Sequence, residues 1–205
     1  MLIPIHPVDP EPRLIRRVAE TLRAGGIIVY PTDTVYGIGC SIEQKDAIEQ
    51  VYLIKRQRNS KPFSFVCSDL THISTYAHVS NPAFKIMKRL VPGPYTFILP
   101  AARMRQLPRI LISKRKTVGI RVPEHNITQA IVKELGHPIL STSATHPETG
   151  EQLNDPLLIR EQFGNQVRLV IDGGLLISEP SSVIDLTGDQ PVVVRKGAGD
   201  LSTVL

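Results

Sequence analysis

Short apolar runs alternate with helix-forming stretches along almost the whole chain, and this alternation limits the fold more than any other feature of the sequence. Gly26–Tyr30 and Phe63–Cys67 have the length and apolar character of buried strands. Pro12–Ala24 and Ile127–Leu135 carry apolar residues at helical spacing. The pattern predicts a layered α/β domain, and hairpin-like spacings late in the chain favour a mixed rather than an all-parallel sheet.

The remaining elements follow from the same patterns. Further helices are predicted over 41–56, from residue 68 onward, over 82–90 and near 156–162, and further strands over 95–100, 118–122, 139–143, 168–171, 182–185 and 192–195. No internal repeat, low-complexity segment or Gly/Ser linker divides the sequence. We therefore expect residues 1–205 to form a single domain.

The composition is that of a globular protein, with 41% hydrophobic and 21% charged residues. It excludes a disordered tail, a coiled coil and a collagen-like fibre. No run approaches the roughly 18–20 apolar residues that span a bilayer, and the N-terminus lacks the apolar core of a signal peptide. Two cysteines, Cys40 and Cys67, are too few for a disulfide framework and suit buried thiols. A cytoplasmic protein without membrane contact is expected.

Positive charge is concentrated in the middle third of the chain. The net charge is +5, but fourteen of the 24 Lys and Arg residues and a single acid, Asp69, lie between Leu53 and Arg121. Such a block favours binding of phosphates or polyanions. The alternative is a solvated basic face that only aids solubility.

Three segments carry the residue types of a ligand site. Tyr30–Gly39 follows a predicted strand and packs hydroxyls, one carboxylate and two glycines into a loop before a predicted helix, although such residues can also simply cap the helix. Lys55–Pro62 holds four cations at a helix end, which suits a clamp for phosphate oxygens or a solvated face. Leu140–Thr145 places hydroxyls after an apolar strand. Walker, GxGxxG and His-Glu metal motifs are absent from the sequence, and no metal site is predicted.

These segments, in this order, resemble the YrdC/YciO family, which is related to the threonylcarbamoyl-AMP synthases. The resemblance covers nearly the whole chain and includes four further motifs: Pro92-Gly93-Pro94-x-Thr96, Val118–Pro123, Ser181–Asp185 and Val194-Arg195-x-Gly197. It implies a twisted mixed sheet with flanking helices around a basic cleft. It also implies condensation of L-threonine, bicarbonate and ATP (as its Mg²⁺ complex) to threonylcarbamoyl-AMP and pyrophosphate. That product feeds N6-threonylcarbamoyladenosine synthesis in tRNA, with tRNA-modification proteins as possible partners.

The resemblance also assigns roles to residues. The threonine and carbamate pocket would contain Thr34, Tyr36, Arg121 and Ser181. The nucleotide would contact Lys55, Arg56, Arg58, Thr96, Ser141, Ser143, Thr145 and Arg195, and of these Lys55, Arg58 and Ser143 are the implied catalytic residues. No acid–base pair is required if the carbamate oxygen is already anionic, because fixed cations can stabilise the charge that develops on the phosphates.

Two positions depart from the synthase pattern and resemble the YciO branch. Gln57 stands where the synthases have the arginine of Lys-x-Arg, and Thr145 stands where they have the asparagine of Ser-x-Asn. Threonine keeps a hydroxyl but lacks the paired donor and acceptor of an amide. These departures leave open a binding protein that has lost turnover.

A second hypothesis is an RNA-binding protein in tRNA or rRNA maturation. It rests on the basic block, especially Lys114-Arg115-Lys116. Few aromatic residues lie between the cations, so structured or double-stranded RNA fits better than stacked single strands. Binding of this kind would weaken steeply with added salt.

Overall fold

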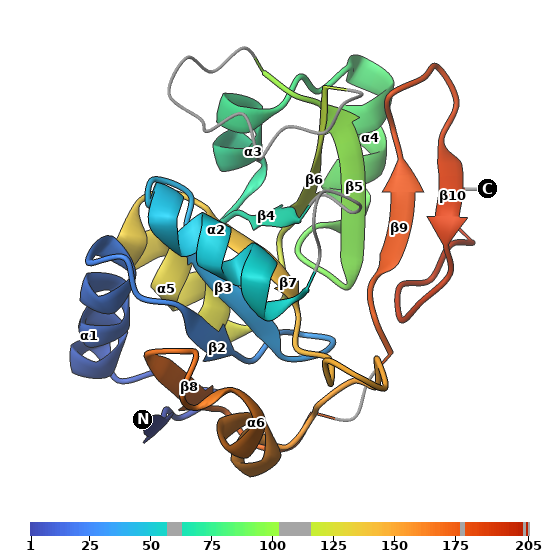
Figure 1. Ribbon diagram of the computed structural model, residues 1–205. Coiled ribbons are helices and arrows are strands. Elements are labelled where there is room, and N and C mark those ends of the chain that lie inside the picture. The colour runs from blue at the N-terminus through green and yellow to red at the C-terminus, as the bar shows by residue number, and fades with distance from the viewer. Residues whose placement is uncertain (57–62, 103–115, 177–178, 203, 205) are drawn as a thin grey trace.

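The computed structural model describes residues 1–56, 63–102, 116–176, 179–202 and 204. Its helices are α1 (Pro12–Arg23), α2 (Lys45–Ile54), α3 (Leu70–Tyr76), α4 (Asn81–Leu90), α5 (Asn126–Leu135) and α6 (Pro156–Phe163). Its strands are β1 (Leu2–Pro4), β2 (Ile28–Tyr30), β3 (Gly37–Ser41), β4 (Ser64–Val66), β5 (Tyr95–Pro100), β6 (Thr117–Arg121), β7 (Ile139–Ser143), β8 (Leu169–Asp172), β9 (Ser182–Asp185) and β10 (Val192–Arg195). Figure 1 shows their arrangement.

The ten strands form one mixed sheet in the order β1-β8-β2-β3-β7-β4-β6-β5-β9-β10. The pairs β1/β8, β2/β8, β4/β6 and β5/β9 are parallel, and the other neighbours are antiparallel. This confirms the predicted α/β class and the mixed sheet.

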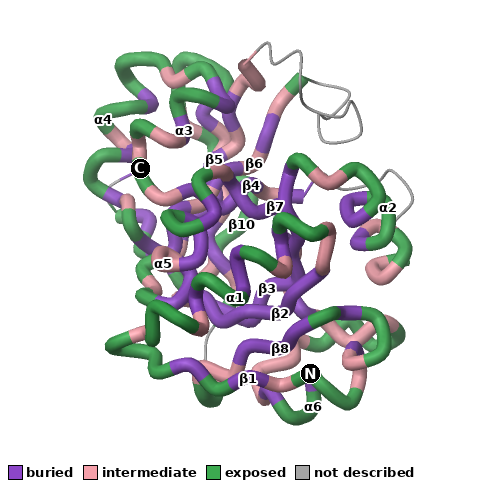
Figure 2. Tube along the Cα trace, turned by 90° about the vertical axis from the view of Figure 1, so that its left-hand side faces the viewer, coloured by how far each residue is buried: buried purple, intermediate pink, exposed green. Residues whose placement is uncertain are grey.

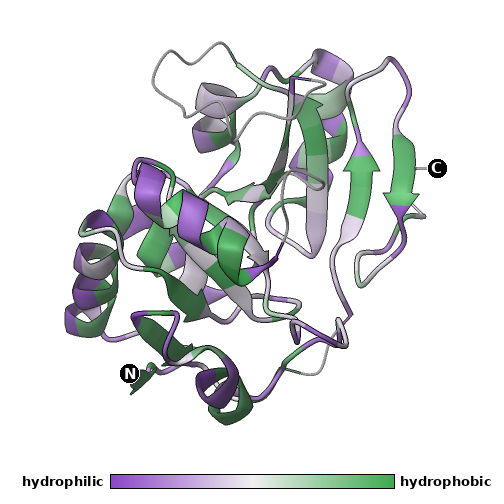
Figure 3. Cartoon of the chain, in the orientation of Figure 1, coloured by the Kyte–Doolittle hydropathy of each residue, from purple (hydrophilic) through white to green (hydrophobic). Residues whose placement is uncertain are grey.

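One face of the central strands carries the hydrophobic core. A row of register partners crosses six strands, and all its members are fully buried: Cys40, Leu140, Phe65, Ile120, Phe97 and Ile184. Helices α2, α3, α4 and α6 pack their buried residues into the same cluster. Burial of this face supplies the hydrophobic stabilisation of the sheet, and Figures 2 and 3 show the buried, apolar strands at the centre.

The opposite face is covered over only part of its width. Helices α1 and α5 pack there in a second core cluster with residues of β1, β2, β8, β4 and β7. Among the described residues, β5, β6, β9 and β10 contribute none to that cluster. The row of register partners on this face consists largely of small or polar residues: Gly39, Ser141, Ser64, Gly119, Ile98 and Asp185. Small side chains and partial helix cover leave a polar surface on this half of the sheet.

Two strands were not predicted. The N-terminal β1 pairs in parallel with β8, with Leu2 opposite Val170. Strand β3 was assigned to the loop and to the start of the next helix, which begins only at Lys45 rather than Ser41. Residues 31–36 therefore connect two antiparallel strands, β2 and β3, instead of leading from a strand into a helix.

The glycines of β3 leave room for the Tyr30 ring and for the neighbouring strand β7. A Cβ on Gly37 or Gly39 would lie 3.1 Å from an atom of that ring. The chain can therefore pair on both edges, with β2 and β7, while the ring lies close to its glycines. Glycine otherwise weakens strands, which is why the sequence pattern did not indicate one.

Candidate anion-binding site

The loop between β2 and β3 is organised by its two threonines. The Thr32 hydroxyl donates to the Val35 carbonyl at 2.6 Å, and it accepts from the Thr34 backbone N–H at 3.2 Å. Because a carbonyl can only accept, the Thr34 hydroxyl must donate to Thr32, whose oxygen lies 3.1 Å away. The Thr34 oxygen is thereby left to accept from another group.

That group is Arg121, at the end of β6. Its Nη2 donates to the Thr34 hydroxyl at 2.9 Å and to the carboxylate of Asp33 at 2.8 Å. The Arg121 Nε is buried and has no hydrogen-bond partner among the described residues. Since buried polar groups are almost always satisfied, this orphaned donor marks a place for a water molecule or a ligand oxygen.

A second arginine lies near the first. Arg195, on β10, directs its Nε and Nη2 at the Ser181 carbonyl, at 3.1 and 2.8 Å. Burial, and then the nearby positive charge of Arg121, lower the pKa of Arg195. The buried hydroxyl of Ser181 in turn lies 2.7 Å from that of Thr96 on β5. Thr34 and Arg121 form one hydrogen-bonded group, and Arg195, Ser181 and Thr96 form a second one. The two groups belong in part to the paired strands β5 and β6.

Lys55 caps the C-terminal end of α2 and joins it to the segment after β7. Its ammonium donates to the Ser143 carbonyl at 3.0 Å and to the hydroxyl of Thr145. Burial lowers the pKa of Lys55. Thr145, one of the two departures from the synthase pattern, is therefore a direct partner of the lysine.

Two tyrosines support the site from within the fold. The Tyr30 hydroxyl donates to Ser141 at 2.6 Å, and burial raises its pKa to about 12. The Tyr36 hydroxyl donates to the Gly174 carbonyl and accepts from the Gly173 N–H, and burial raises its pKa to about 12 as well. Tyr36 is fully buried, so its hydroxyl ties the loop to the chain after β8.

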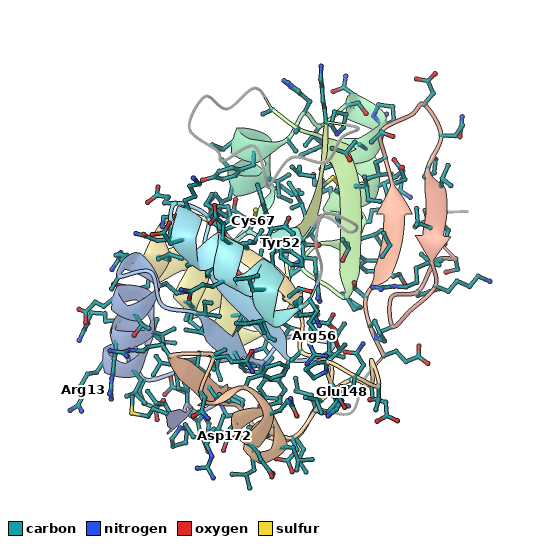
Figure 4. All side chains as sticks on the ribbon, in the orientation of Figure 1. Arg13, Tyr52, Arg56, Cys67, Glu148 and Asp172 are labelled. Carbon is teal, nitrogen blue, oxygen red and sulfur yellow. The ribbon has the colours of Figure 1, made fainter. Side chains whose placement is uncertain are left out.

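Arg56, another predicted site residue, lies at the end of α2. Arg56 is exposed and adopts a left-handed backbone conformation with φ 49°, and Figure 4 shows it at the end of the helix. Arg58 and Gln57 lie outside the described residues, as do Lys114 and Arg115 of the basic block.

Sequence reasoning gave no role to Asp33 or Tyr30, which hold two of the predicted site residues. The only available signal was their position in the Tyr30–Gly39 segment. Their partners lie 88 and 111 residues away, so the contacts could be seen only in the folded chain.

Other features of the described residues do not compete with this site. A hollow of about 620 Å³ lies between the end of α1, the Gly25–Gly26 turn and the chain before β8, and it holds none of the predicted site residues. The described part of the chain contains no group of three His, Cys, Asp or Glu residues suited to a metal ion, and none of its helices is long and apolar enough to cross a membrane. Cys40 and Cys67 are buried, and burial raises the pKa of both.

The fold and these contacts define an α/β protein with a cationic, hydroxyl-rich site on an incompletely covered sheet. The Sua5/YciO/YrdC family model, described as "Telomere recombination", matches residues 20–197. The chain belongs to this family.

Its relatives include both uncharacterized proteins and synthases. The chain is 46% identical to the uncharacterized protein YciO of Escherichia coli K12 over 202 residues, which is 98% of this chain and 97% of YciO. The crystal structure of E. coli YciO superimposes with a TM-score of 0.94, covering 100% of this chain and 99% of that one. Identity to the threonylcarbamoyl-AMP synthase of Vibrio vulnificus YJ016 is 29% over 192 residues, 89% of this chain and 98% of the synthase.

A structure with a bound amino acid is also similar. P. abyssi Sua5, crystallised in complex with L-threonine, has a TM-score of 0.91 and 28% identity. The match covers 100% of this chain but only 59% of that protein.

Proposed function

We propose that this protein binds ATP and L-threonine and forms threonylcarbamoyl-AMP and pyrophosphate in the presence of bicarbonate. The observation that carries the proposal is the nearly buried guanidinium of Arg121, whose Nε donor has no partner among the described residues. Such a donor favours an anionic ligand. The named activity of the V. vulnificus relative and the L-threonine in the P. abyssi complex indicate which ligands to test.

In this proposal the amino-acid half of the site is built on Arg121. Its guanidinium binds the threonine carboxylate, with the Thr34 and Ser181 hydroxyls beside it. Arginine suits this role because its planar fork matches a carboxylate. Tyr36, whose hydroxyl is already bonded to the backbone at Gly173 and Gly174, supports the pocket wall rather than donating to substrate.

The nucleotide half lies between Lys55 and Arg195. Both cations take the triphosphate oxygens, with Arg56 as a further cation at the end of α2. Arg58, which lies outside the described residues, is assigned the same role. The hydroxyls of Thr96, Ser141, Ser143 and Thr145 provide hydrogen bonds. The described contacts of Lys55 are to uncharged oxygens. A bound phosphate would stabilise this partly buried ammonium, because a nearby negative charge favours the charged form of lysine.

The chemistry needs positioning more than a protein base. The threonine amine adds to the carbon of bicarbonate with loss of water, which gives a carbamate. A carbamate oxygen then attacks the α-phosphorus of ATP, and the bond to the β-phosphate bridging oxygen breaks to release pyrophosphate. The nucleophile is already anionic, so fixed cations and the Mg²⁺ of the substrate complex stabilise the transition state.

The test is product formation from ¹³C-bicarbonate, ATP and L-threonine. Mass spectrometry should show ¹³C-labelled threonylcarbamoyl-AMP, with pyrophosphate released only when all three substrates are present. Arg121→Ala and Lys55→Met should each lower turnover by about a hundredfold or more, because each leaves an anion without its partner. Asp189→Asn, at an exposed position in the β9–β10 loop, should match the wild type. A folded wild-type protein that yields no labelled product contradicts the proposal.

A further inference from the structure

Asp33 joins the two segments that carry the amino-acid half of the proposed site. One carboxylate oxygen accepts from Arg121 Nη2 at 2.8 Å, and the other accepts from the backbone N–H of Glu124 at 3.0 Å. The side chains of Asp33 and Arg121 are only 8% and 12% exposed. The carboxylate thus links the β2–β3 loop to the segment between β6 and α5 in a nearly buried setting.

The guanidinium of Arg121 has one nitrogen that is hydrogen-bonded twice and another that is not bonded to any described residue. Both Asp33 and Thr34 bind the same nitrogen, Nη2. Nε has no partner among the described residues. With two acceptors on Nη2, rotation of the guanidinium is restricted, and the Nε donor is held in one direction.

We propose that Asp33 is a positioning residue, which orients Arg121 so that its remaining donors bind the carboxylate of the amino-acid substrate. This inference rests on the proposed function. It assigns to Asp33 no contact with substrate: the residue acts through Arg121 and through the Glu124 backbone.

Asp33 has two effects, its negative charge and its orientation of Arg121, and they predict opposite changes in threonine binding when the carboxylate is removed. Its negative charge, 2.8 Å from Arg121, weakens the attraction of that arginine for a second anion. If charge alone mattered, a neutral residue at 33 would strengthen threonine binding. If orientation matters, the same substitution weakens binding, because the guanidinium loses a charged acceptor and the Glu124 N–H loses its partner.

The experiment compares Asp33→Asn and Asp33→Glu with the wild type, and uses Asp189→Asn as a control with the same change of charge at an exposed position. L-threonine binding is measured by calorimetry, and KM is measured separately for L-threonine and ATP. For Asp33→Asn we expect the Kd and KM for threonine to rise about tenfold. The KM for ATP should change by less than about twofold, because Asp33 contacts no residue assigned to the phosphates.

Asp33→Glu keeps the charge but moves the carboxylate by one methylene, and it serves if Asp33→Asn does not fold. It should also raise the KM for threonine selectively, by a smaller factor. Threonine binding that is unchanged or tighter in the variants overturns the proposal, as does a parallel rise of both KM values. If the wild-type protein itself binds no threonine, the proposed function is wrong as well. The wild-type measurement therefore distinguishes failure of the proposed function from failure of the role given to Asp33.

Discussion

Lys55 holds a positive charge that its described contacts do not neutralise. Its ammonium bonds to the Ser143 carbonyl and the Thr145 hydroxyl, both uncharged, and burial lowers its pKa. At the residue scale, then, the site keeps cationic groups in settings that favour a bound anion. Arg195 shows the same property, since its two strongest described contacts are to a backbone carbonyl.

The lowered pKa of Lys55 leads to a testable pH dependence. In the free protein the ammonium should lose its proton below the usual 10.5 of lysine, and bound ATP should raise that pKa again because phosphate favours the charged form. NMR of ¹³C-dimethylated lysines would follow this titration, with Lys55→Met identifying the resonance. A pKa that ATP leaves unmoved contradicts the assignment.

The same shift has a consequence for stability, with its sign set by proton binding. Between the folded-state pKa and 10.5 the unfolded chain binds more protons at Lys55 than the folded chain. The contribution of this group to the free energy of unfolding therefore rises with pH in that window. Lys55→Met should remove this rise, as measured by the difference between the two urea-unfolding curves across pH.

At the scale of the elements, the site depends on a row of small residues on the less covered face of the sheet. Gly119 on β6 lies opposite Ser64 on β4, which in turn lies opposite Ser141 on β7. A Cβ on Gly119 would lie 3.0 Å from the Ser64 hydroxyl oxygen, which can rotate away. Because these side chains are small, a ligand can approach the strands closely at this place.

Gly119→Val should consequently weaken ATP binding with little loss of stability. We expect the Kd for ATP to rise about tenfold or more, whereas the Tm should change by only a few degrees, since valine suits a strand. Gly188→Val, in an exposed turn with open space around its Cβ position, is the matched control. Equal ATP affinity in all three proteins would show that this row does not form part of the nucleotide site.

The elements also show where sequence patterns suffice and where they fail. Strands β5 and β7 coincide with their predicted ranges because their apolar runs are buried in the main core. The sequence pattern does not indicate strand β3 because two of its five residues, Gly37 and Gly39, are glycines, and only the folded chain shows that Tyr30 and strand β7 lie where their Cβ atoms would be. The bond between Asp33 and Arg121 could not be predicted, since no periodicity relates residues 88 positions apart.

At the scale of the whole molecule, the ten-stranded sheet brings together segments that are distant in sequence. Arg121 ends strand β6 and Asp33 lies in the loop after β2, yet the two side chains bond to each other, and the positive charge of Arg121 contributes to the lowered pKa of Arg195 on the edge strand β10. Family membership explains why the ordered motifs recur.

In the proposed function, Arg121, Lys55 and Arg195 together hold an amino acid beside a nucleoside triphosphate. A crystal structure of the protein with L-threonine and a non-hydrolysable ATP analogue tests it most directly. We predict the threonine carboxylate within hydrogen-bond distance of the Arg121 guanidinium and the triphosphate between Lys55 and Arg195. Ligands bound elsewhere, for example in the hollow beside Arg17 and Arg168, with Arg121 still unoccupied, would contradict it.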